Sequence, residues 1–373
     1  MQSDTVLRHF TTTFKFFPRI KTQKVKPWQI NRMHDVLNCH EFDWLLDEYK
    51  EWLQMNNKII PIFFTIDDNF APYLSVAIKS MLDNANKDYF YNVHIVHEGL
   101  SNENKNKLKQ LETSNSSIIF NEMDNKLECI QDKLENRLRA DIFTLSIYFR
   151  IFIPEMFQEY DKAIYLDSDI VVLGDISELY NCDLKGNLIG ACIDKSIVGI
   201  KPIEDYFTIG VGVDYREYFN SGILLFDMKK MREVKLADKF LYLFNKYHFE
   251  NIDPDQSYLN AMCYGKVLHL DNTWDTMPND TFPPVENPKL IHYNLFSKPW
   301  RKSGVQYEEY FWKYAKETNY YDTLIEELNN TTIEDLKKDE ETLNFMLQRC
   351  EEIINIEKGT FKDIFDNGIE ERL

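Results

Sequence analysis

The chain has 373 residues, of which 44% are hydrophobic and 14% aromatic. That composition suffices for one large α/β domain with additions, or for two domains. Lysine and arginine number 43 against 61 aspartates and glutamates, which gives a formal net charge of −18. Because a phosphate backbone requires a basic surface, this charge argues against nucleic acid as a partner and favours a small ligand.

The first 28 residues form a basic and aromatic arm, in which six cations stand against the single acid Asp4. This arm is suited to an anionic membrane surface, and equally to packing on the acidic body of the protein itself. No stretch has the apolar length of a signal peptide or a membrane span. The six cysteines are scattered without metal-binding spacing, which predicts a reduced, cytoplasmic protein, peripheral at the inner face of the membrane if the arm binds lipid.

The predicted elements alternate between strands and helices. Residues 29–57 are expected to be helical, and residues 59–66 form a fully apolar strand that ends at Asp67, Asp68 and Asn69. Further strands are predicted over 92–96, 117–120, 163–166, 188–193 and 267–270, and helices over 71–82, 101–111, 142–157, 235–247 and 254–264. This alternation predicts a mostly parallel sheet, with ligands bound at the carboxyl ends of its strands.

Polar residues border several of these strands. Residues 218–227 place Asn220, Ser221 and Gly222 just before a buried strand, and residues 289–291 lead into His292. From residue 307 onward the chain is acidic and helical, with one apolar face made by Leu343, Met346, Leu347, Cys350 and Ile354. The predicted organisation is therefore an N-terminal arm with helices (1–57), a central α/β domain (58–306) and a C-terminal helical appendage (307–373).

The strand at 163–166 ends in two acids, Asp167 and Asp169. Residues two apart can point to the same side, and two carboxylates held together favour a hard cation such as Mg²⁺ or Mn²⁺. Two alternatives stay open at this point, because Asp-Ser-Asp also suits a simple turn, and aspartyl phosphatases deliver a similar pair from a strand. The chain has no glycine-rich phosphate loop, so a bound nucleotide would need a metal for its phosphates.

Seven motifs together resemble glycosyltransferase family 8, the retaining GT-A enzymes that include bacterial lipooligosaccharide galactosyltransferases and glucosyltransferases. In chain order between residues 59 and 300 they are FTIDDNF, YFRIFIP, YDKAIYLDSDIVVLGD, LIGACID, FNSGILLFD, DQSYLN and HYNLFSKPW. The resemblance implies a GT-A fold, a Rossmann-like mixed sheet flanked by helices. It also implies a UDP-sugar donor and a glycan, glycolipid or glycoprotein acceptor.

The resemblance further implies a role for particular residues. The metal ligands would be Asp167, Asp169 and His292, holding Mn²⁺ or Mg²⁺. The catalytic positions would be Gln256, Asp255 and Asp194, with Gln256 under the far face of the sugar. The residues expected to bind the nucleotide-sugar are Thr65, Asp67, Asn69, Arg150, Asp167, Ser168, Asp194, Asn220, Ser221, Gln256 and Lys298.

One position departs from the family pattern, since Leu295 stands where the family often has glycine after the metal-binding histidine. The expected reaction transfers a hexose with retention, by attack on the face that the leaving group departs from. The polar residues 195–215 are expected to form an acceptor lid. A catalytically inactive sugar-binding or scaffold subunit of a transferase complex is the alternative from another functional class.

Overall fold

The computed structural model describes residues 58–123, 134–137, 144–196, 198–279 and 283–373, together with two short strands near the N-terminus. These strands are β1 (Thr12–Thr13) and β2 (Lys24–Val25), and they pair in antiparallel fashion. The rest of the basic arm and the predicted helices of residues 29–57 lie outside the described residues, so the membrane contact stays a prediction. Within the described ranges, no helix is both long and apolar enough to cross a bilayer.

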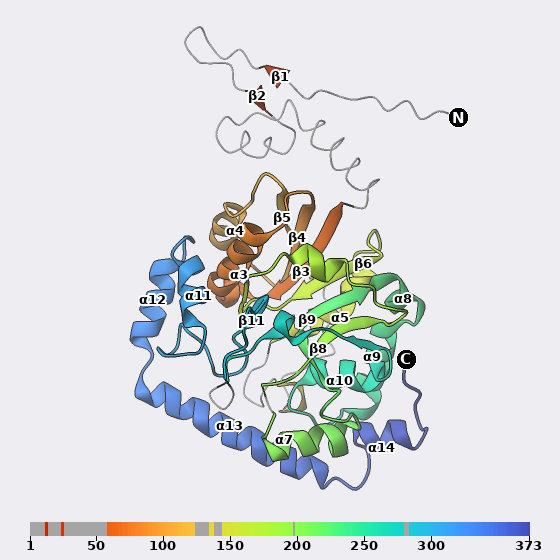
Figure 1. The fold of residues 1–373 in the computed structure, drawn as a ribbon. Helices are drawn as coiled ribbons and strands as arrows, with labels where there is room; N and C mark the ends of the chain where they lie inside the picture. The colour runs from red at the N-terminus through yellow and green to blue at the C-terminus, as the bar shows by residue number, and fades with distance from the viewer. Residues whose placement is uncertain are drawn as a thin grey trace, which may run out of the picture.

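A seven-stranded mixed sheet forms the centre of the molecule, in the order β10-β8-β9-β6-β3-β4-β5 (Figure 1). The strands are β3 (Ile59–Ile66), β4 (Phe90–His97), β5 (Ser116–Glu122), β6 (Lys162–Leu166), β8 (Ile189–Ile193), β9 (Phe219–Asp227) and β10 (Val267–His269). Neighbours are parallel except at β9, which runs antiparallel to both β6 and β8. The start of β9 therefore lies at the same edge as the ends of β6 and β8.

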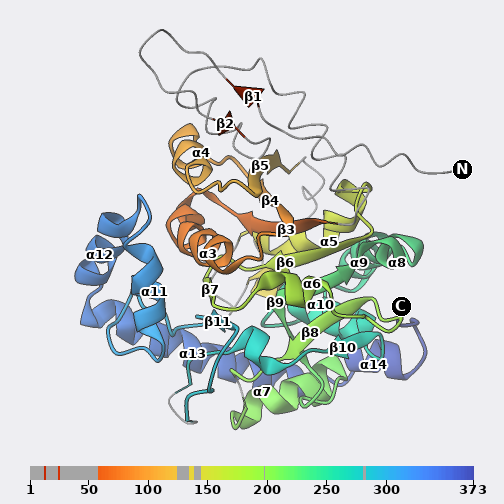
Figure 2. The same cartoon turned by 45° about the horizontal axis from the view of Figure 1, so that its top comes forward.

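Helices cover both faces of this sheet (Figure 2). Both faces need cover because successive side chains of β6 point to opposite sides and are apolar on each. Ile164 and Leu166 belong to one hydrophobic cluster, and Ala163 and Tyr165 belong to the other. The first cluster includes side chains of α3 (Ala71–Asn84), α4 (Asn102–Lys109), α6 (Ile176–Tyr180), α11 (Glu308–Ala315) and α12 (Tyr321–Asn330). The second includes side chains of α5 (Ser146–Met156), α8 (Met228–Glu233), α9 (Leu236–Tyr247) and α10 (Pro254–Cys263).

Shorter elements complete the frame around the sheet edge. A two-stranded antiparallel pair joins β7 (Ile170–Val172) to β11 (Leu290–His292). The single-turn 3₁₀ segments are η2 (Asp68–Phe70), η4 (Leu134–Asn136) and η6 (Asn272–Asp275). Of these elements, the β7–β11 pair matters most for the site, because it brings residue 292 beside residue 170.

The C-terminal residues form a long helix, α13 (Ile333–Ile354), that extends past α7 (Lys201–Asp205) to α14 (Phe361–Asp366) (Figure 1). The predicted apolar face is confirmed, since Met346 and Cys350 are buried and Leu343, Leu347 and Ile354 pack against the second cluster. Thr332 begins α13 with a capping box. The domain division at residue 306 stays a prediction.

Two local expectations are corrected by the structure. Residues 195–215 are not a polar loop, because α7 (Lys201–Asp205) and a π-helical turn, η5 (Tyr206–Val211), occupy most of them. Tyr206 and Phe207 are buried there, and Phe207 stacks on Tyr218 with ring centroids 3.5 Å apart. Second, Asn220, Ser221 and Gly222 lie inside β9 rather than before it.

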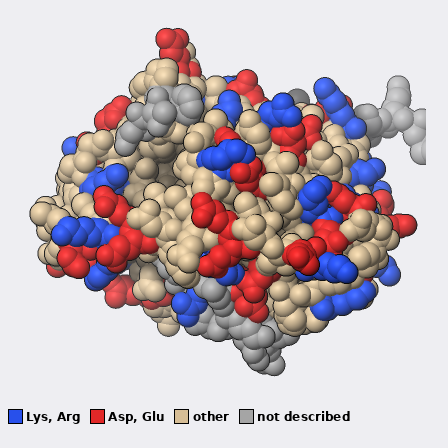
Figure 3. Space-filling model, turned by 90° about the horizontal axis from the view of Figure 1, so that it is seen from below, with Lys and Arg blue, Asp and Glu red and all other residues tan. Residues whose placement is uncertain are grey.

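Charged side chains of both signs are mixed on one face of the molecule. On the face in Figure 3, lysines and arginines are interspersed with aspartates and glutamates and do not gather into an extended basic patch. This face therefore offers no continuous track for a nucleic-acid backbone. The four cysteines in the described part of the chain, Cys182, Cys192, Cys263 and Cys350, are free thiols.

Candidate metal and nucleotide-sugar site

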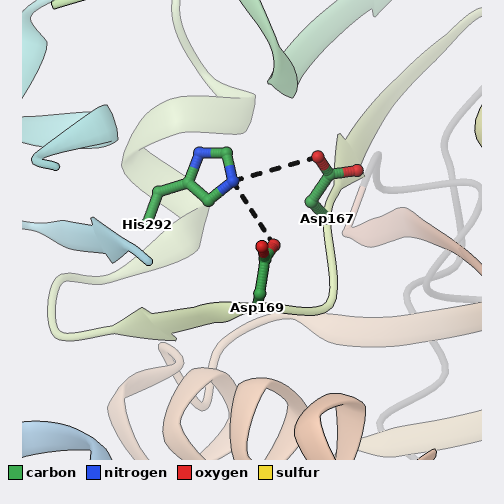
Figure 4. Close-up of side chains that lie close together, drawn as sticks. All are labelled: Asp167, Asp169 and His292. Carbon is green, nitrogen blue, oxygen red and sulfur yellow. Dashed lines mark ion pairs between the residues drawn. The ribbon is translucent and has the colours of Figure 1, made fainter. Parts of the chain in front are cut away.

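Asp167, Asp169 and His292 converge at one edge of the sheet (Figure 4). One potential ligand atom from each lies within 4.8 Å of the others. The His292 Nε2 atom is 3.3 Å from Asp169 Oδ1 and 3.9 Å from Asp167 Oδ2. Three side chains of these types around one point form a candidate site for a divalent cation.

Backbone pairing produces this convergence. Asp167 and Asp169 flank the bend between β6 and β7, and pairing of β11 with β7 sets His292 opposite Ile170. The Tyr293 backbone N–H donates to the Asp169 carbonyl oxygen at 2.9 Å, and the Asp167 N–H donates to the Gly222 carbonyl oxygen at 2.7 Å. The bend between β6 and β7 is thus held in place by β9 and β11, two strands that are distant from it in the sequence.

Gly222 leaves the space that the two ligands on either side of it require. A Cβ atom at this position would lie 2.5 Å from His292 Cε1 and 2.7 Å from Asp167 Oδ2, both closer than real contacts allow. The glycine in β9 is therefore explained by close approach of side chains and not by a turn. This fit supports a cluster built to hold an ion.

Asp275, which the sequence analysis missed, stands behind His292. Its Oδ1 atom is 3.0 Å from His292 Nδ1, so the ring nitrogen facing away from the cluster is bonded to a carboxylate. Such a partner fixes the tautomer and the orientation of a metal-binding histidine. Asp275 is fully buried, and its other oxygen finds no hydrogen-bond partner among the described residues.

The electrostatics of this cluster are strongly perturbed. Burial disfavours the charged imidazole, but Asp169 and Asp275 outweigh it and raise the pKa of His292 to about 10. Burial raises the pKa of Asp275 to about 6, although its bond to His292 opposes this shift. For Asp169, burial raises the pKa, but Lys298 and His292 outweigh it and lower the pKa below its usual value. The carboxylates of this group therefore stabilise positive charge placed among them, which fits a cation site.

Lys298 provides a partly buried positive charge at the wall of the site. Its ammonium group contacts Asp169 and the Tyr293 carbonyl oxygen. Leu295, the residue that departs from the family pattern, lies three positions before Lys298 in the same loop. Its backbone adopts a φ of 52°. Leucine therefore holds the left-handed conformation that glycine adopts freely, and the Asn294 side chain accepts its N–H at 2.7 Å.

Arg150 is a buried link between the two halves of the site. Its guanidinium lies 3.0 Å from Asp167 Oδ1 and 3.1 Å from Asp255 Oδ2, and it donates to the Ser221 carbonyl oxygen at 2.6 Å. It also lies over the Tyr165 ring, 4.5 Å from the centroid. Burial lowers the pKa of Arg150, but Asp167 and Asp255 outweigh it, so the pKa is raised and the charge is secure.

The second half of the site is a hydrogen-bonded group of buried side chains around Gln256. Asp194 accepts from Asn220 at 3.2 Å and from Gln256 at 3.1 Å. The Ser221 hydroxyl donates to Asp255 at 3.0 Å, and the Ser221 N–H donates to Gln256 Oε1 at 2.9 Å. The five residues that the sequence singled out here therefore form one network, joined to the metal cluster through Arg150.

The remaining predicted residues lie in β3 or directly after β3 and β6. Thr65 hydrogen-bonds to Tyr165, whose hydroxyl donates to Asp167 Oδ1 at 2.7 Å. Asp67 begins η2 and accepts the Asn69 N–H at 2.9 Å, which makes a short turn at the edge of the sheet. Ser168 is buried between the two acidic ligands. Asp68, the other acid of that turn, instead accepts from Ser101 and Asn104 and is structural.

A cavity of about 260 Å³ opens over the metal cluster. Its walls include the cluster, Lys298, the aromatic rings of Phe70, Tyr73 and Trp300, and two acids of the C-terminal helices, Glu327 and Asp339. Tyr73 stacks on Trp300 with centroids 4.3 Å apart and donates to Glu327 at 2.8 Å. The C-terminal helices thus form part of the wall, which no sequence motif indicated.

Comparison with known proteins decides the family. A model of glycosyl transferase family 8 matches residues 61–304, which is more than half of the chain. The chain belongs to this family. The match confirms the resemblance drawn from the seven motifs, and it removes the support for an aspartyl phosphatase.

The proteins that this chain resembles include named glycosyltransferases and one with a crystal structure. A lipopolysaccharide 1,2-glucosyltransferase of Escherichia coli (strain K12) is 24% identical, over 81% of this chain and 85% of the relative. The glycosyltransferase GlyB of Streptococcus pneumoniae serotype 4 is 30% identical, over 70% of this chain and 62% of GlyB. A crystal structure of the galactosyltransferase LgtC with donor and acceptor sugar analogs is 25% identical, with a TM-score of 0.60 over 70% of this chain and 96% of LgtC. The GT-A fold is thereby confirmed.

Proposed function

We propose that this glycosyltransferase moves a hexose, glucose or galactose, from a UDP-sugar to a hydroxyl group of a glycan, glycolipid or glycoprotein acceptor, with retention at the anomeric carbon. The observation that carries the proposal is the convergence of Asp167, Asp169 and His292 at the wall of a cavity that also contains Lys298. Two carboxylates and an imidazole suit Mn²⁺, with Mg²⁺ as the alternative, and leave coordination positions for diphosphate oxygens.

The phosphates would depend on this cluster. The chain contains no glycine-rich phosphate loop, so a diphosphate would depend on a metal held by the three ligands and on the cations that line the cavity, Lys298 and Arg301. When bound, the metal ion would supply Lewis-acid stabilisation of the charge that develops on the departing UDP. Lys298 would add a fixed positive charge on the same side of the cavity.

The nucleoside would lie toward β3. Asp67 and Asn69, in the turn that follows β3, offer a carboxylate and an amide to the uracil and the ribose. Phe70 of the same turn lines the cavity and offers a flat apolar face on which a base can stack. The buried side chains of Asp194 and Asn220 supply polar groups to the sugar hydroxyls.

Retention is best explained by attack on the face from which UDP departs. The bond between the anomeric carbon and the UDP oxygen breaks with its electron pair on UDP, the acceptor oxygen bonds to the same carbon, and the acceptor proton passes to the departing phosphate. Gln256 is a neutral amide and a poor nucleophile. Asp255 is buried and already bonded to Arg150 and Ser221, which favours a supporting role for it over covalent attack.

The test is UDP release from a panel of UDP-sugars with Mn²⁺, Mg²⁺ or EDTA. We expect one UDP-hexose to turn over in a metal-dependent manner, and Asp169→Asn to abolish that turnover. Asp161→Asn is the matched control, because it makes the same change of charge on an exposed residue of the same motif that pairs only with Arg232 in the described structure. Absence of UDP-sugar binding and turnover in the native chain would refute the proposal and leave the non-catalytic sugar-binding subunit.

A further inference from the structure

The side-chain amide of Gln256 is held by three hydrogen bonds at once. Its Nε2 atom donates to Asp194 Oδ2 and to Asp253 Oδ2, each at 3.1 Å. Its Oε1 atom accepts the Ser221 backbone N–H at 2.9 Å. The two amide hydrogens are therefore both taken by carboxyl groups.

This network permits only one orientation of the amide. With oxygen and nitrogen exchanged, Oε1 would face two carboxyl oxygens and the NH₂ group would face the Ser221 N–H, so all three contacts would become repulsive. In the observed orientation no N–H remains for a ligand. The carbonyl oxygen, which accepts one bond, is the atom of Gln256 that can still interact with a sugar.

Asp253 joins Gln256 to a group of buried hydroxyls. It is buried, and its Oδ2 atom, which accepts from Gln256, also accepts the Tyr218 hydroxyl at 2.9 Å. Its Oδ1 atom contacts the Ser257 hydroxyl, which is also 2.8 Å from the Tyr206 hydroxyl. Every polar contact of this carboxyl group is therefore to another buried side chain.

The clamp does not require a charged Asp253. Burial raises the pKa of this carboxyl to about 7, although its bonds from Ser257 and Tyr218 oppose the shift. When it is protonated on Oδ1, the carboxyl donates to the Ser257 oxygen, and Oδ2 continues to accept from Gln256. An asparagine can reproduce that arrangement atom for atom, whereas an alkyl side chain cannot.

We propose that Asp253 is a positioning residue for glycosyl transfer, which together with Asp194 holds both N–H groups of Gln256 so that the amide presents only its carbonyl oxygen to the donor sugar. The inference rests on the proposed function and on the position under the far face of the sugar that the family resemblance implies for Gln256. Positive charge develops at the anomeric carbon as the bond to UDP breaks. A fixed carbonyl dipole stabilises that charge, and a freely rotating amide would present an N–H to it part of the time.

Activity provides the first test. We expect Asp253→Ala to lower kcat roughly tenfold to a hundredfold, the range for a buried donor left without its hydrogen-bond partner, with little change in KM for the donor. Asp253→Asn should stay within about threefold of wild type. Tyr218→Phe is the matched control, since it removes another bond to Asp253 without touching Gln256. In a Gln256→Ala background, Asp253→Ala should cause no further loss of kcat; losses that multiply would overturn the proposal.

A second measurement does not depend on turnover. In protein labelled with ¹⁵N-glutamine, the Gln256 side-chain resonances are assigned by their loss in Gln256→Ala. We expect two distinct, exchange-protected N–H signals in wild type and in Asp253→Asn, and a shifted or averaged pair in Asp253→Ala. Asp253→Leu, which keeps the branched shape of the side chain but has no acceptor, replaces the alanine variant if that variant does not fold.

The two tests separate the inference from the function it rests on. If the native chain turns over no UDP-sugar, the proposed function fails, while the wild-type spectrum still decides whether the amide is clamped. Rapidly exchanging Gln256 N–H signals in the wild type, or signals unchanged in the variant without an acceptor, would overturn the role of Asp253.

Discussion

Gly222 is the residue whose substitution should separate metal binding from folding. A Cβ atom there would lie 2.5 Å from His292 Cε1 and 2.7 Å from Asp167 Oδ2, whereas ordinary contacts begin near 3.4 Å. Gly222→Ala therefore requires the imidazole to move by 3.4 − 2.5 = 0.9 Å and the carboxylate oxygen by 3.4 − 2.7 = 0.7 Å. Metal ligands must stay within about 0.2 Å of their preferred distances. Two of the three ligands would leave that range.

The assay is titration of the metal-free protein with Mn²⁺, followed by the electron paramagnetic resonance signal of the free ion. Since substitutions behind the ligands typically cost about 10–100-fold in metal affinity, we expect Gly222→Ala to cost more than about 100-fold. Overpacking should also destabilise the fold by about 1–3 kcal/mol, seen as a lower Tm.

A matched control exists in the neighbouring strand β8. A Cβ atom at Gly190 would lie 3.1 Å from Leu184 Cδ2 and 3.3 Å from Leu225 Cβ, so Gly190→Ala makes the same chemical change in the apolar core. It should lower the Tm and leave Mn²⁺ affinity unchanged. Wild-type affinity in Gly222→Ala, or equal loss of affinity in both variants, would refute the reasoning.

Three further outcomes are expected. Asp275→Asn keeps the shape of the side chain but removes its charge, and Mn²⁺ titration should show about a 10–100-fold loss of affinity; unchanged affinity would show that the buried carboxylate does not support the site. Arg150→Ala leaves Asp167 and Asp255 without their shared buried partner, so denaturant unfolding should show a loss of about 3–5 kcal/mol, and a loss below about 1 kcal/mol would contradict the buried ion pair. The pKa of Asp253 is about 7 in the folded chain and about 3.8 when unfolded, so the folded chain holds this proton more tightly and the contribution of Asp253 to stability falls as pH rises from about 4 to about 7. Asp253→Asn should therefore flatten this part of the profile of unfolding free energy against pH, measured on metal-free protein. An unaltered profile would show that Asp253 does not titrate in this window.

The sequence by itself indicated most of the helices and strands and the three residues of the candidate metal site. Apolar runs such as IIPIFFTI are strands because their side chains suit burial on both faces of a sheet, and all eight residues of this run are buried in β3. The acids Asp167 and Asp169 were visible because they follow such a strand directly. His292 was assigned through the motif that contains it, and the β7–β11 pair brings it to the acids.

The sequence pattern gave a wrong prediction where apolar residues at helical spacing were surrounded by polar residues. Residues 195–215 contain enough polar residues and glycine to suggest a loop, yet Ile203, Tyr206, Phe207 and Val211 follow helical spacing and are buried. These residues form helical turns because burying their apolar side chains contributes more folding free energy than the turn preferences of the neighbouring polar residues oppose.

Only the tertiary structure decided which buried groups support the site. Asp275 lies 17 residues before His292, Asp253 stands beneath Gln256, and Glu327 reaches the cavity from a helix more than 250 residues after Tyr73. None of these acids belongs to a motif, and a single acid in a sequence gives no sign of its partner. Hydrogen bonds between distant residues depend on strand order and on the antiparallel direction of β9 within the described seven-stranded sheet, and the pattern of one segment contains neither.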